Sequence, residues 1–330
     1  MTIVQSHGRA ALGMAALLIG LSIGRLAAAE TITVTHWGAA FYGAPYAVAM
    51  DKGFFKQRSV DVTGILTSTG GGTSVRNTLA GDLPYGEVAL PAAIEAIRAG
   101  QPIKIVCAGA ESVADILWIA KPDSPMNSIK DIVGKKIGYT SPGSVTNMLI
   151  LMAMKAQGID ASKVTLVPAG GIGANLAAVL SGAIDAGMTG EPVWSQQKAK
   201  VKPVFWTKDV LPPNMTQTVG IVTEELAAAR PDKIRAIIAG RREGVQFIAA
   251  HPDEAADITA KAYNIDPALT REVFKHFLAI GYWSEGALDY AAMDRMVEGL
   301  KIVGKLKEPV SWPQVVDVSF LPEDLQAKIH

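Results

Sequence analysis

The chain is poor in the residue types on which disulfides, metal centres and many nucleophilic enzymes depend. It holds 1 cysteine in 330 residues, so no internal disulfide can form. Its 5 histidines show neither the H-x-x-H nor the H-E-x-x-H spacing of zinc sites. The lone Cys107 lies in the strand-like run Ile103 to Ala108, which favours a small buried hydrophobe over a reactive thiol. We therefore predict neither a metal site nor a catalytic cysteine.

Motifs for catalysis and for cofactors are missing as well. Neither a G-x-S-x-G nucleophile elbow nor a G-x-x-x-x-G-K-[ST] phosphate loop occurs in the sequence. The run Gly171 to Leu176 begins like a dinucleotide fingerprint but lacks its third glycine. The sequence therefore predicts no catalytic residues and no cofactor.

An excess of charge of either sign is also absent. The 31 basic and 31 acidic residues balance, so bulk electrostatics suggests neither nucleic acid nor a membrane surface as a partner. Hydrophobic residues make up 49% of the chain and charged residues 19%, a composition that can bury large cores. A chain of this length is expected to form two lobes of ordinary size.

The first 29 residues differ from the rest. Arg9 precedes an apolar run from Ala10 to Ile23, and Ala27 to Ala29 form an A-x-A cleavage pattern. These features predict a secretory signal peptide over residues 1–29, and an uncleaved N-terminal anchor stays open as an alternative. Its removal takes away two arginines and no acid, which leaves a net charge of 29 − 31 = −2.

Strand-like and helix-like runs alternate along most of the chain. Such alternation implies parallel strand pairing with right-handed crossovers. A strand at 216–222 should return the chain to the first lobe, and helical periodicity then dominates to the end. The expected strands lie at 31–35, 60–66, 87–90, 103–108, 135–139, 164–167, 185–188 and 201–205; the expected late helices lie at 232–249, 253–263, 267–280 and 288–303, before a last extended piece at 316–320.

Polar, glycine-rich turns follow several of these strands. The clearest comes after the strand Lys135–Tyr139, where a Ser/Pro/Gly turn leads to Ser144, a good N-cap for the next helix. The free N–H groups of that helix start favour an anion. Since ligands bind beyond the carboxyl ends of parallel strands, two facing lobes would gather these turns into one cleft.

Aromatic and acidic side chains near these turns have two readings each. Trp37, Phe41, Tyr42 and Trp194 are candidates for the apolar walls of a cleft, or for core packing. Glu191 can meet an amine of a solute or cap its own helix. The residue pattern alone leaves both alternatives open.

Six motifs spread over residues 31 to 325 then carry a resemblance. They are Tyr42-x-x-Pro45-x-x-x-Ala49-x-x-x-Gly53-Phe54-Phe55, Leu79-Ala80-Gly81-Asp82, Asp131-Ile132-Val133-Gly134-Lys135-Lys136-Ile137-Gly138, Ser141-Pro142-Gly143-Ser144, Glu191-Pro192 and Val318-Ser319-Phe320-Leu321-Pro322. In combination they resemble the nitrate/sulfonate/taurine group of ABC-transporter solute-binding proteins, also called SsuA/THI5-like or NMT1-like.

The resemblance implies an α/β, type II periplasmic-binding-protein fold. Two Rossmann-like lobes would be joined by a two-strand hinge, with the C-terminal helices packed on lobe one. Lobe one is then expected at residues 30–113 and 220–330, and lobe two at 114–219. The ligand-binding residues that the family's loops and the polar turns together suggest are Trp37, Phe41, Tyr42, Ser68, Thr69, Gly71, Thr73, Leu90, Ser112, Ser141, Ser144, Val145, Thr146, Glu191 and Trp194.

The implied function is the exported, monomeric solute-binding component of an ABC importer, with a permease and its ATPase as partners. The implied ligand is a small organic anion, either sulfonate- or taurine-like or an aromatic or carboxylate solute. The run Ala89-Leu90-Pro91-Ala92 is less polar than the matching turn of many relatives, which favours the larger ligands over nitrate or a small sulfonate. Alternatives are a thiamine-pyrimidine-precursor binding protein or enzyme of the same fold, and a sensory binding protein.

Overall fold

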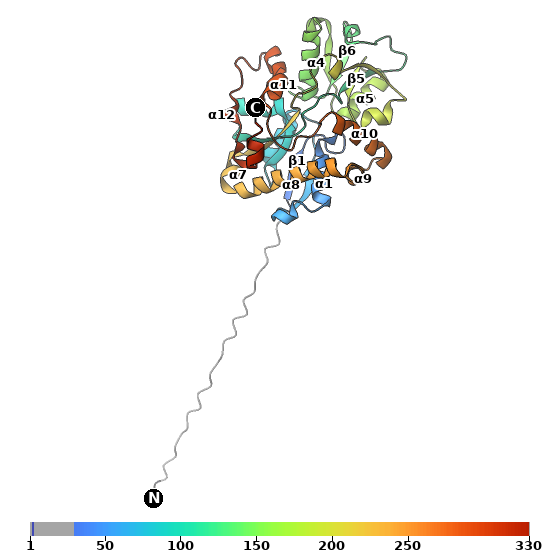
Figure 1. Ribbon diagram of the computed structural model, residues 1–330. Coiled ribbons are helices and arrows are strands. Elements are labelled where there is room, and N and C mark those ends of the chain that lie inside the picture. The colour runs from blue at the N-terminus through green and yellow to red at the C-terminus, as the bar shows by residue number, and fades with distance from the viewer. Residues whose placement is uncertain (1, 3–29, 330) are drawn as a thin grey trace.

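The computed structural model describes residue 2 and residues 30–329 (Figure 1), so the predicted signal peptide, apart from residue 2, lies outside the described residues. The strands are β1 (Glu30–Val34), β2 (Val62–Leu66), β3 (Tyr85–Ala89), β4 (Ile103–Ala108), β5 (Leu117–Ala120), β6 (Lys136–Tyr139), β7 (Thr165–Pro168), β8 (Gly187–Thr189), β9 (Lys202–Trp206) and β10 (Thr218–Thr223). The α-helices are α1 (Ala44–Asp51), α2 (Gly72–Ala80), α3 (Leu90–Arg98), α4 (Val145–Ala156), α5 (Ile172–Ser181), α6 (Val193–Gln197), α7 (Glu224–Ala229), α8 (Pro231–Ala250), α9 (Pro252–Tyr263), α10 (Pro267–Ala279), α11 (Tyr290–Ile302), α12 (Trp312–Val315) and α13 (Glu323–Gln326).

Lobe one is built on a five-stranded sheet in the order β2-β1-β3-β10-β4. β1 pairs in parallel with β2 and β3, whereas β10 runs antiparallel to both β3 and β4. Every residue of β3 is buried, as expected for a central strand with helices on both faces.

Lobe two is built on β8-β5-β9 and the parallel pair β6-β7. A single parallel bridge between Ile137 and Ala186 places β6 beside the start of β8. Here β5, a strand that the sequence did not predict, runs antiparallel to both β8 and β9, so the parallel pairing expected of the alternating strands does not extend to β5 and β10. Both strands enter their sheet from the other lobe, and they therefore run against the strands made by local crossovers.

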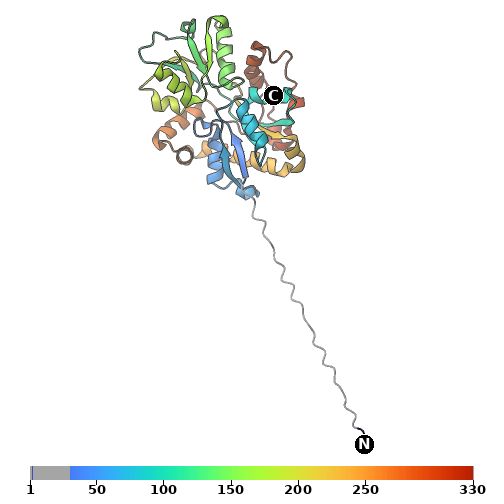
Figure 2. The same cartoon turned by 180° about the vertical axis from the view of Figure 1, so that it is seen from behind.

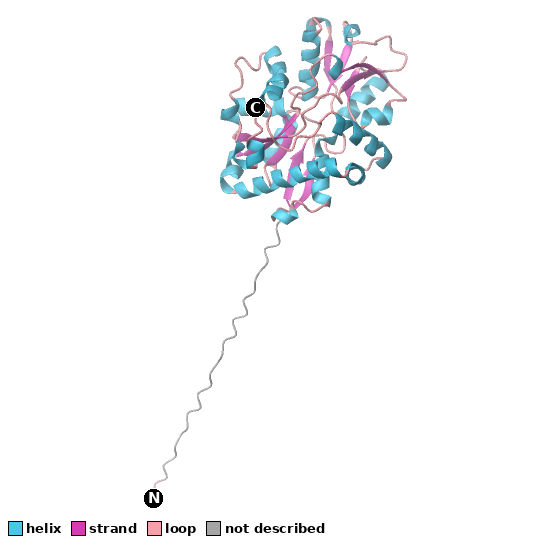
Figure 3. Cartoon of the chain, viewed as in Figure 1, coloured by secondary structure: helices cyan, strands magenta, loops and turns pink. Residues whose placement is uncertain are grey.

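Two segments, residues 109–116 and 207–217, join the lobes and run side by side. The N–H of Val113 donates to the carbonyl of Pro213 at 2.9 Å, and the N–H of Gln217 donates to Ala110 at 2.7 Å. In Figure 3 the strands form two groups, with loops between them. The expected lobe boundaries at 113/114 and 219/220 stay a prediction.

The C-terminal helices pack mainly on lobe one. α8 lies so close to α1 that a side chain at Gly244 would overlap the Pro45 carbonyl, which requires glycine there. α11 also reaches lobe two, because Gly299 packs against Met148 of α4. Figure 2 shows lobe two above the blue start of lobe one, with late helices on both flanks. The expected last extended piece is instead a 3-10 helix, Val318–Phe320.

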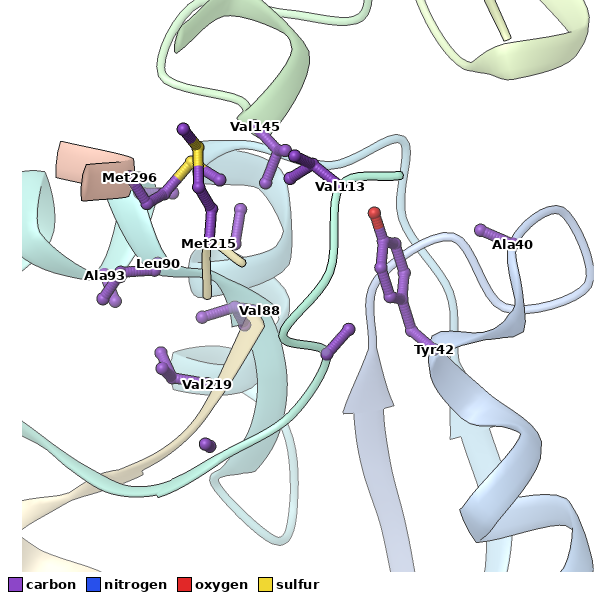
Figure 4. Packing of buried hydrophobic residues seen from close by; sticks show 14 of the residues in the cluster. Ala40, Tyr42, Val88, Leu90, Ala93, Val113, Val145, Met215, Val219 and Met296 are labelled. Carbon is purple, nitrogen blue, oxygen red and sulfur yellow. The ribbon is translucent and has the colours of Figure 1, made fainter. Parts of the chain in front are cut away.

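The apolar core is continuous from the first sheet to α4. In Figure 4 Val145 of α4 lies beside Val113, and Met215 lies beside Met296, so both connecting segments contribute to this packing. A second, smaller cluster lies within lobe two and contains Leu117, Ile119, Val179, Ile184 and Val201. Within residues 30–329 no helix combines the length and apolar character that a bilayer crossing requires.

Candidate functional site

A cavity lies where turns from both lobes meet next to the connecting segments. The space between its walls is about 470 Å³ when its open side is included, but a water-sized sphere can centre itself in only about 30 Å³ of it. The cleft is therefore nearly shut, with room for a few waters at most. Its lining consists of Thr35, His36, Ala40, Tyr42, Gly70, Gly71, Ala89, Asp115, Ile116, Thr140, Ser144, Val145, Thr146, Ile172, Met188, Gly190, Glu191 and Thr218.

Glycines allow the turns of the two lobes to touch across the cleft. Gly71, which precedes α2, has φ 58° and ψ −146°, a conformation that only glycine adopts readily. A Cβ atom there would lie 2.5 Å from the Oγ of Ser141 in lobe two. A Cβ at Gly143 would likewise lie 2.8 Å from Oε1 of Glu95 in lobe one.

The lobe-two wall is a cluster of hydroxyl groups at the start of α4. Ser144 caps the helix, because its Oγ accepts from the N–H of Asn147 at 3.1 Å. The Oγ1 atom of Thr146 accepts from the Thr140 N–H and lies 3.0 Å from the Thr140 hydroxyl. These short local bonds hold the turn, so the cap that the sequence predicts at Ser144 is confirmed.

His36 contributes a neutral ring to the lobe-one wall. Its backbone has φ 53°, and its N–H donates to the carbonyl of Ser68 at 3.0 Å. A Cβ atom at Gly70 would lie 2.5 Å from Nε2 of the His36 ring, so only glycine at position 70 leaves room for the ring. Burial lowers the pKa of His36 to about 4, because the cation loses its hydration.

Asp115 lies in the first connecting segment and is 3% exposed. Its Oδ1 accepts from Nε2 of Gln217 at 3.2 Å, and the Oε1 of Gln217 accepts from the Tyr42 hydroxyl at 2.6 Å. Burial, with a smaller contribution from the nearby carboxylate of Glu191, raises the pKa of Asp115 to about 7. A single chain of hydrogen bonds thus joins lobe one, the connecting segments and the cavity.

Glu191 is the second acid of the lining and follows β8. Its two carboxylate oxygens accept from the N–H of Ser195 at 3.1 Å and from its hydroxyl at 2.9 Å. Burial raises the pKa of Glu191. The carboxylate therefore holds the start of α6 and lines the cavity at once, so both readings of this residue fit the geometry.

The charges on the lining all have one sign. Among the described residues no lysine or arginine lines the cavity. Within residues 30–329 no three His, Cys, Asp or Glu side chains gather as a metal site would require.

Six of the fifteen expected ligand-binding residues lie on the lining, and they come from both lobes: Tyr42, Gly71, Ser144, Val145, Thr146 and Glu191. Of the expected aromatic wall only Tyr42 is among them. Phe41 is fully buried among Tyr263, Phe274 and Phe277. Trp37 packs on Tyr263 with ring centroids 4.9 Å apart, and Trp194 packs on Trp206 at 5.7 Å. These three rings therefore pack against other aromatic side chains and do not line the cavity.

The other expected residues lie close to the cavity without lining it. Ser68 bonds the Ser74 hydroxyl at 2.5 Å, and Thr73 accepts from Arg76 at 3.0 Å. The methyl group of Thr69 faces Gly171. Leu90 is buried in the core below the lining residue Ala89, Ser141 faces Gly71, and Ser112 lines a separate open groove on the connecting segments.

Sequence reasoning missed Asp115 and its partner Gln217. One signal was available, because Asp115 is the only charged residue in the apolar run from Val113 to Ala120. A buried carboxyl group in such a run costs free energy unless it has a partner or a function. The partner comes from a segment about 100 positions away, which spacing along the chain does not reveal.

Comparison with known proteins assigns the class and then the family. A model of the NMT1/THI5 like family matches residues 40–255, which is more than half of the chain. The chain therefore belongs to the NMT1/THI5-like family, and the resemblance noted from its motifs is confirmed. The riboflavin-binding protein RibY of Chloroflexus aurantiacus is 24% identical over 313 residues, which are 84% of this chain and 82% of RibY.

Solved structures agree on the fold. The alkanesulfonate-binding protein SsuA from Xanthomonas axonopodis pv. citri, bound to MOPS, matches with a TM-score of 0.73 at 15% identity, over 88% of this chain and 99% of SsuA. The desulfurization enzyme DszB matches with a TM-score of 0.62 at 16% identity, over 91% and 99%. The periplasmic-binding-protein fold is confirmed, and it serves both binding proteins and an enzyme.

Proposed function

We propose that this protein is the solute-binding component of an ABC importer, exported to the periplasm and working with a permease and its ATPase. The observation that carries the proposal is a single cavity lined by turns of both lobes beside the segments that join them. A solute that contacts both walls stabilises the closed arrangement by its preference for that state. Opening then requires a change in the two connecting segments.

The solute that we propose is a small organic molecule held mainly by neutral groups. The name of the SsuA neighbour and the N–H groups at the start of α4 support the expected organic anion. The two lining carboxyls and the lack of lysine or arginine in the described lining count against it. A ligand as large as riboflavin would require the lobes to separate, because a water-sized sphere can centre itself in only about 30 Å³ of the cavity.

Binding without turnover fits the lining better than catalysis. Cys107 lies in β4, 1% exposed and next to the Tyr85 hydroxyl, away from the cavity. Burial raises the pKa of Cys107, which keeps the thiol protonated and unreactive. An enzyme related to pyrimidine synthesis on this fold would need another nucleophile or acid–base pair, and no observation specifically favours one.

Calorimetric titration with taurine, alkanesulfonates, benzoate, phthalate, pyrimidine precursors and riboflavin tests the proposal, together with mass spectrometry of solutes that co-purify. Two adjacent alanines supply a matched pair of variants, because Ala40 lines the cavity and Ala39 does not. Ala40→Val should weaken binding of the solute that is found, whereas Ala39→Val should leave it unchanged. Failure of every solute to bind, with none co-purifying, would overturn the assignment.

A further inference from the structure

The polarity of the cavity is opposite to that of a site for a free anion. Its described lining holds two carboxyls, Asp115 and Glu191, and neither lysine nor arginine. The only basic ring, His36, is held neutral by burial. A sulfonate or nitrate would bring a third negative charge into this enclosed space, where electrostatic repulsion is poorly screened.

Asp115 lines the cavity, and one of its carboxylate oxygens receives a hydrogen bond from the side chain of another residue. The orientation of Gln217 is settled, because its Nε2 donates to the carbonyl of Ser112, a group that can only accept. The same nitrogen donates to Oδ1 of Asp115, and Oε1 receives the Tyr42 hydroxyl. Oδ1 is therefore occupied from the connecting segments, while Oδ2 faces Gly190, whose added Cβ would lie 3.4 Å away.

No ion pair within residues 30–329 joins Asp115 to a lysine or arginine. A buried carboxylate without a positive partner is costly, and a partner from the solute would remove that cost. Glu191 is different, because Ser195 already supplies hydrogen bonds to both of its oxygens. Asp115 thus receives a hydrogen bond from one other residue's side chain, whereas Ser195 supplies two bonds to Glu191.

We propose that Asp115 determines the specificity of this site by binding a basic nitrogen of the solute at Oδ2. This inference rests on the proposed function, since it assumes that the cavity is the solute site. The neutral donors and acceptors of Thr140, Ser144 and Thr146 on the opposite wall would receive the polar, uncharged remainder of the solute. Solutes that carry an amine or amidine group are bound, and simple sulfonates and nitrate are rejected.

The test uses pairs of small probes that share a skeleton and differ in charge. Benzylamine and benzamidine are compared with benzenesulfonate and benzoate, and butylamine with butanesulfonate, by calorimetry and by thermal shift on the mature protein. The basic member of each pair should bind, and Asp115→Asn should lower its affinity by about tenfold or more, as expected for a hydrogen bond to a charged group. Glu191→Gln, the matched control, should have a smaller effect.

A second variant guards against misfolding of Asp115→Asn. Gly190→Ala leaves the carboxylate intact but fills the space beside Oδ2, so it should also weaken basic probes selectively. Tight binding of the anionic probes, unchanged or improved by Asp115→Asn, would overturn the specificity proposal and leave the binding function standing. Binding of no probe, together with no co-purified solute, would overturn both.

Discussion

The two walls of the cavity are built in different ways. On the lobe-one side, the side chain of Thr218 donates to Glu87 at 2.7 Å, and Glu87 forms a fully buried ion pair with Arg241 at 2.9 Å. On the lobe-two side, the turn at 140–146 is held by hydroxyl bonds between residues no more than six positions apart. The first wall depends on distant partners, and the second is a local motif.

The apolar clusters behind the two walls differ in extent. The large apolar cluster extends from lobe one through the connecting segments into lobe two, where it includes Trp118, Ile137 and Met188, whereas the cluster that belongs to lobe two alone has five buried members. The lobe-one wall reaches Asp115 of the connecting segment through Tyr42 and Gln217, and such fixed partners are suited to hold a carboxyl group in place. A locally folded turn can be carried as a unit when the lobes move, without loss of its own hydrogen bonds.

The largest expected effect is on the stability of lobe one. Arg241→Met leaves the Glu87 carboxylate buried without its cation, which should lower the free energy of unfolding by about 3–5 kcal/mol. The measurement is urea unfolding followed by circular dichroism. If the buried ion pair does not stabilise the fold, the urea concentration at the unfolding midpoint will be the same in Arg241→Met as in the wild type.

Arg235→Met is the matched control on the same helix. Arg235 pairs with Asp232 at 3.1 Å, but its side chain is 48% exposed and that of Asp232 is 99% exposed. Such exposed pairs contribute about 0–1 kcal/mol. A loss as large as that of Arg241→Met would mean that α8 tolerates no shortened arginine, and the contrast between the walls would fail.

The second prediction concerns pH and the connecting segments. The pKa of Asp115 is raised from 3.8 to about 7 in the folded protein, so folding favours its protonated form. The contribution of Asp115 to the free energy of unfolding is fully present below pH 4 and is lost as the pH rises through 7. The loss is at most about 4 kcal/mol. Relative to Asp115→Asn, the wild type should therefore lose stability between pH 4 and pH 7.

The comparison with Asp115→Asn is needed because His36 acts in the opposite direction. Its pKa is lowered from 6.5 to about 4, so its contribution is lost as the pH falls through 4. The groups that face Asp115 are Glu191, Tyr42 and Tyr282, besides Gln217, and none of them is positively charged. Parallel unfolding curves for the two proteins across this range would contradict the raised pKa.

The sequence predicted the parts of the structure that depend on neighbouring residues better than the parts that depend on residues far apart in the chain. The Ser144 cap, the turn and α4 depend on neighbours in the chain, and they were predicted almost to the residue. The four late helices were also placed within about two residues at most ends by their periodicity and their prolines. Local patterns carry this information because helix periodicity and capping involve residues within one or two turns.

The missed parts are those that depend on partners far apart in the chain. The strand β5 was not predicted at all, and its antiparallel direction, like that of β10, follows from the crossing between lobes, which no local pattern encodes. Phe41 looked like a ligand-facing ring, but Phe274 and Phe277 of α10 surround it. Aromatic residues near a cleft have the same local signature whether they line it or support it from behind.

The smallest expected effect is on closure itself, where the two walls meet. Gly71→Ala places a Cβ atom 2.5 Å from the Ser141 Oγ and 3.1 Å from the Pro142 carbonyl, so the lobe-two turn must retreat. Solute affinity should then fall by about tenfold, the equivalent of 1.4 kcal/mol. Gly134→Ala shares the positive φ, 75°, but its Cβ meets nothing within 4 Å, so it should leave affinity unchanged. Adding Ser141→Ala to Gly71→Ala removes the nearer contact and should restore part of the affinity, which backbone strain at Gly71 alone would not allow.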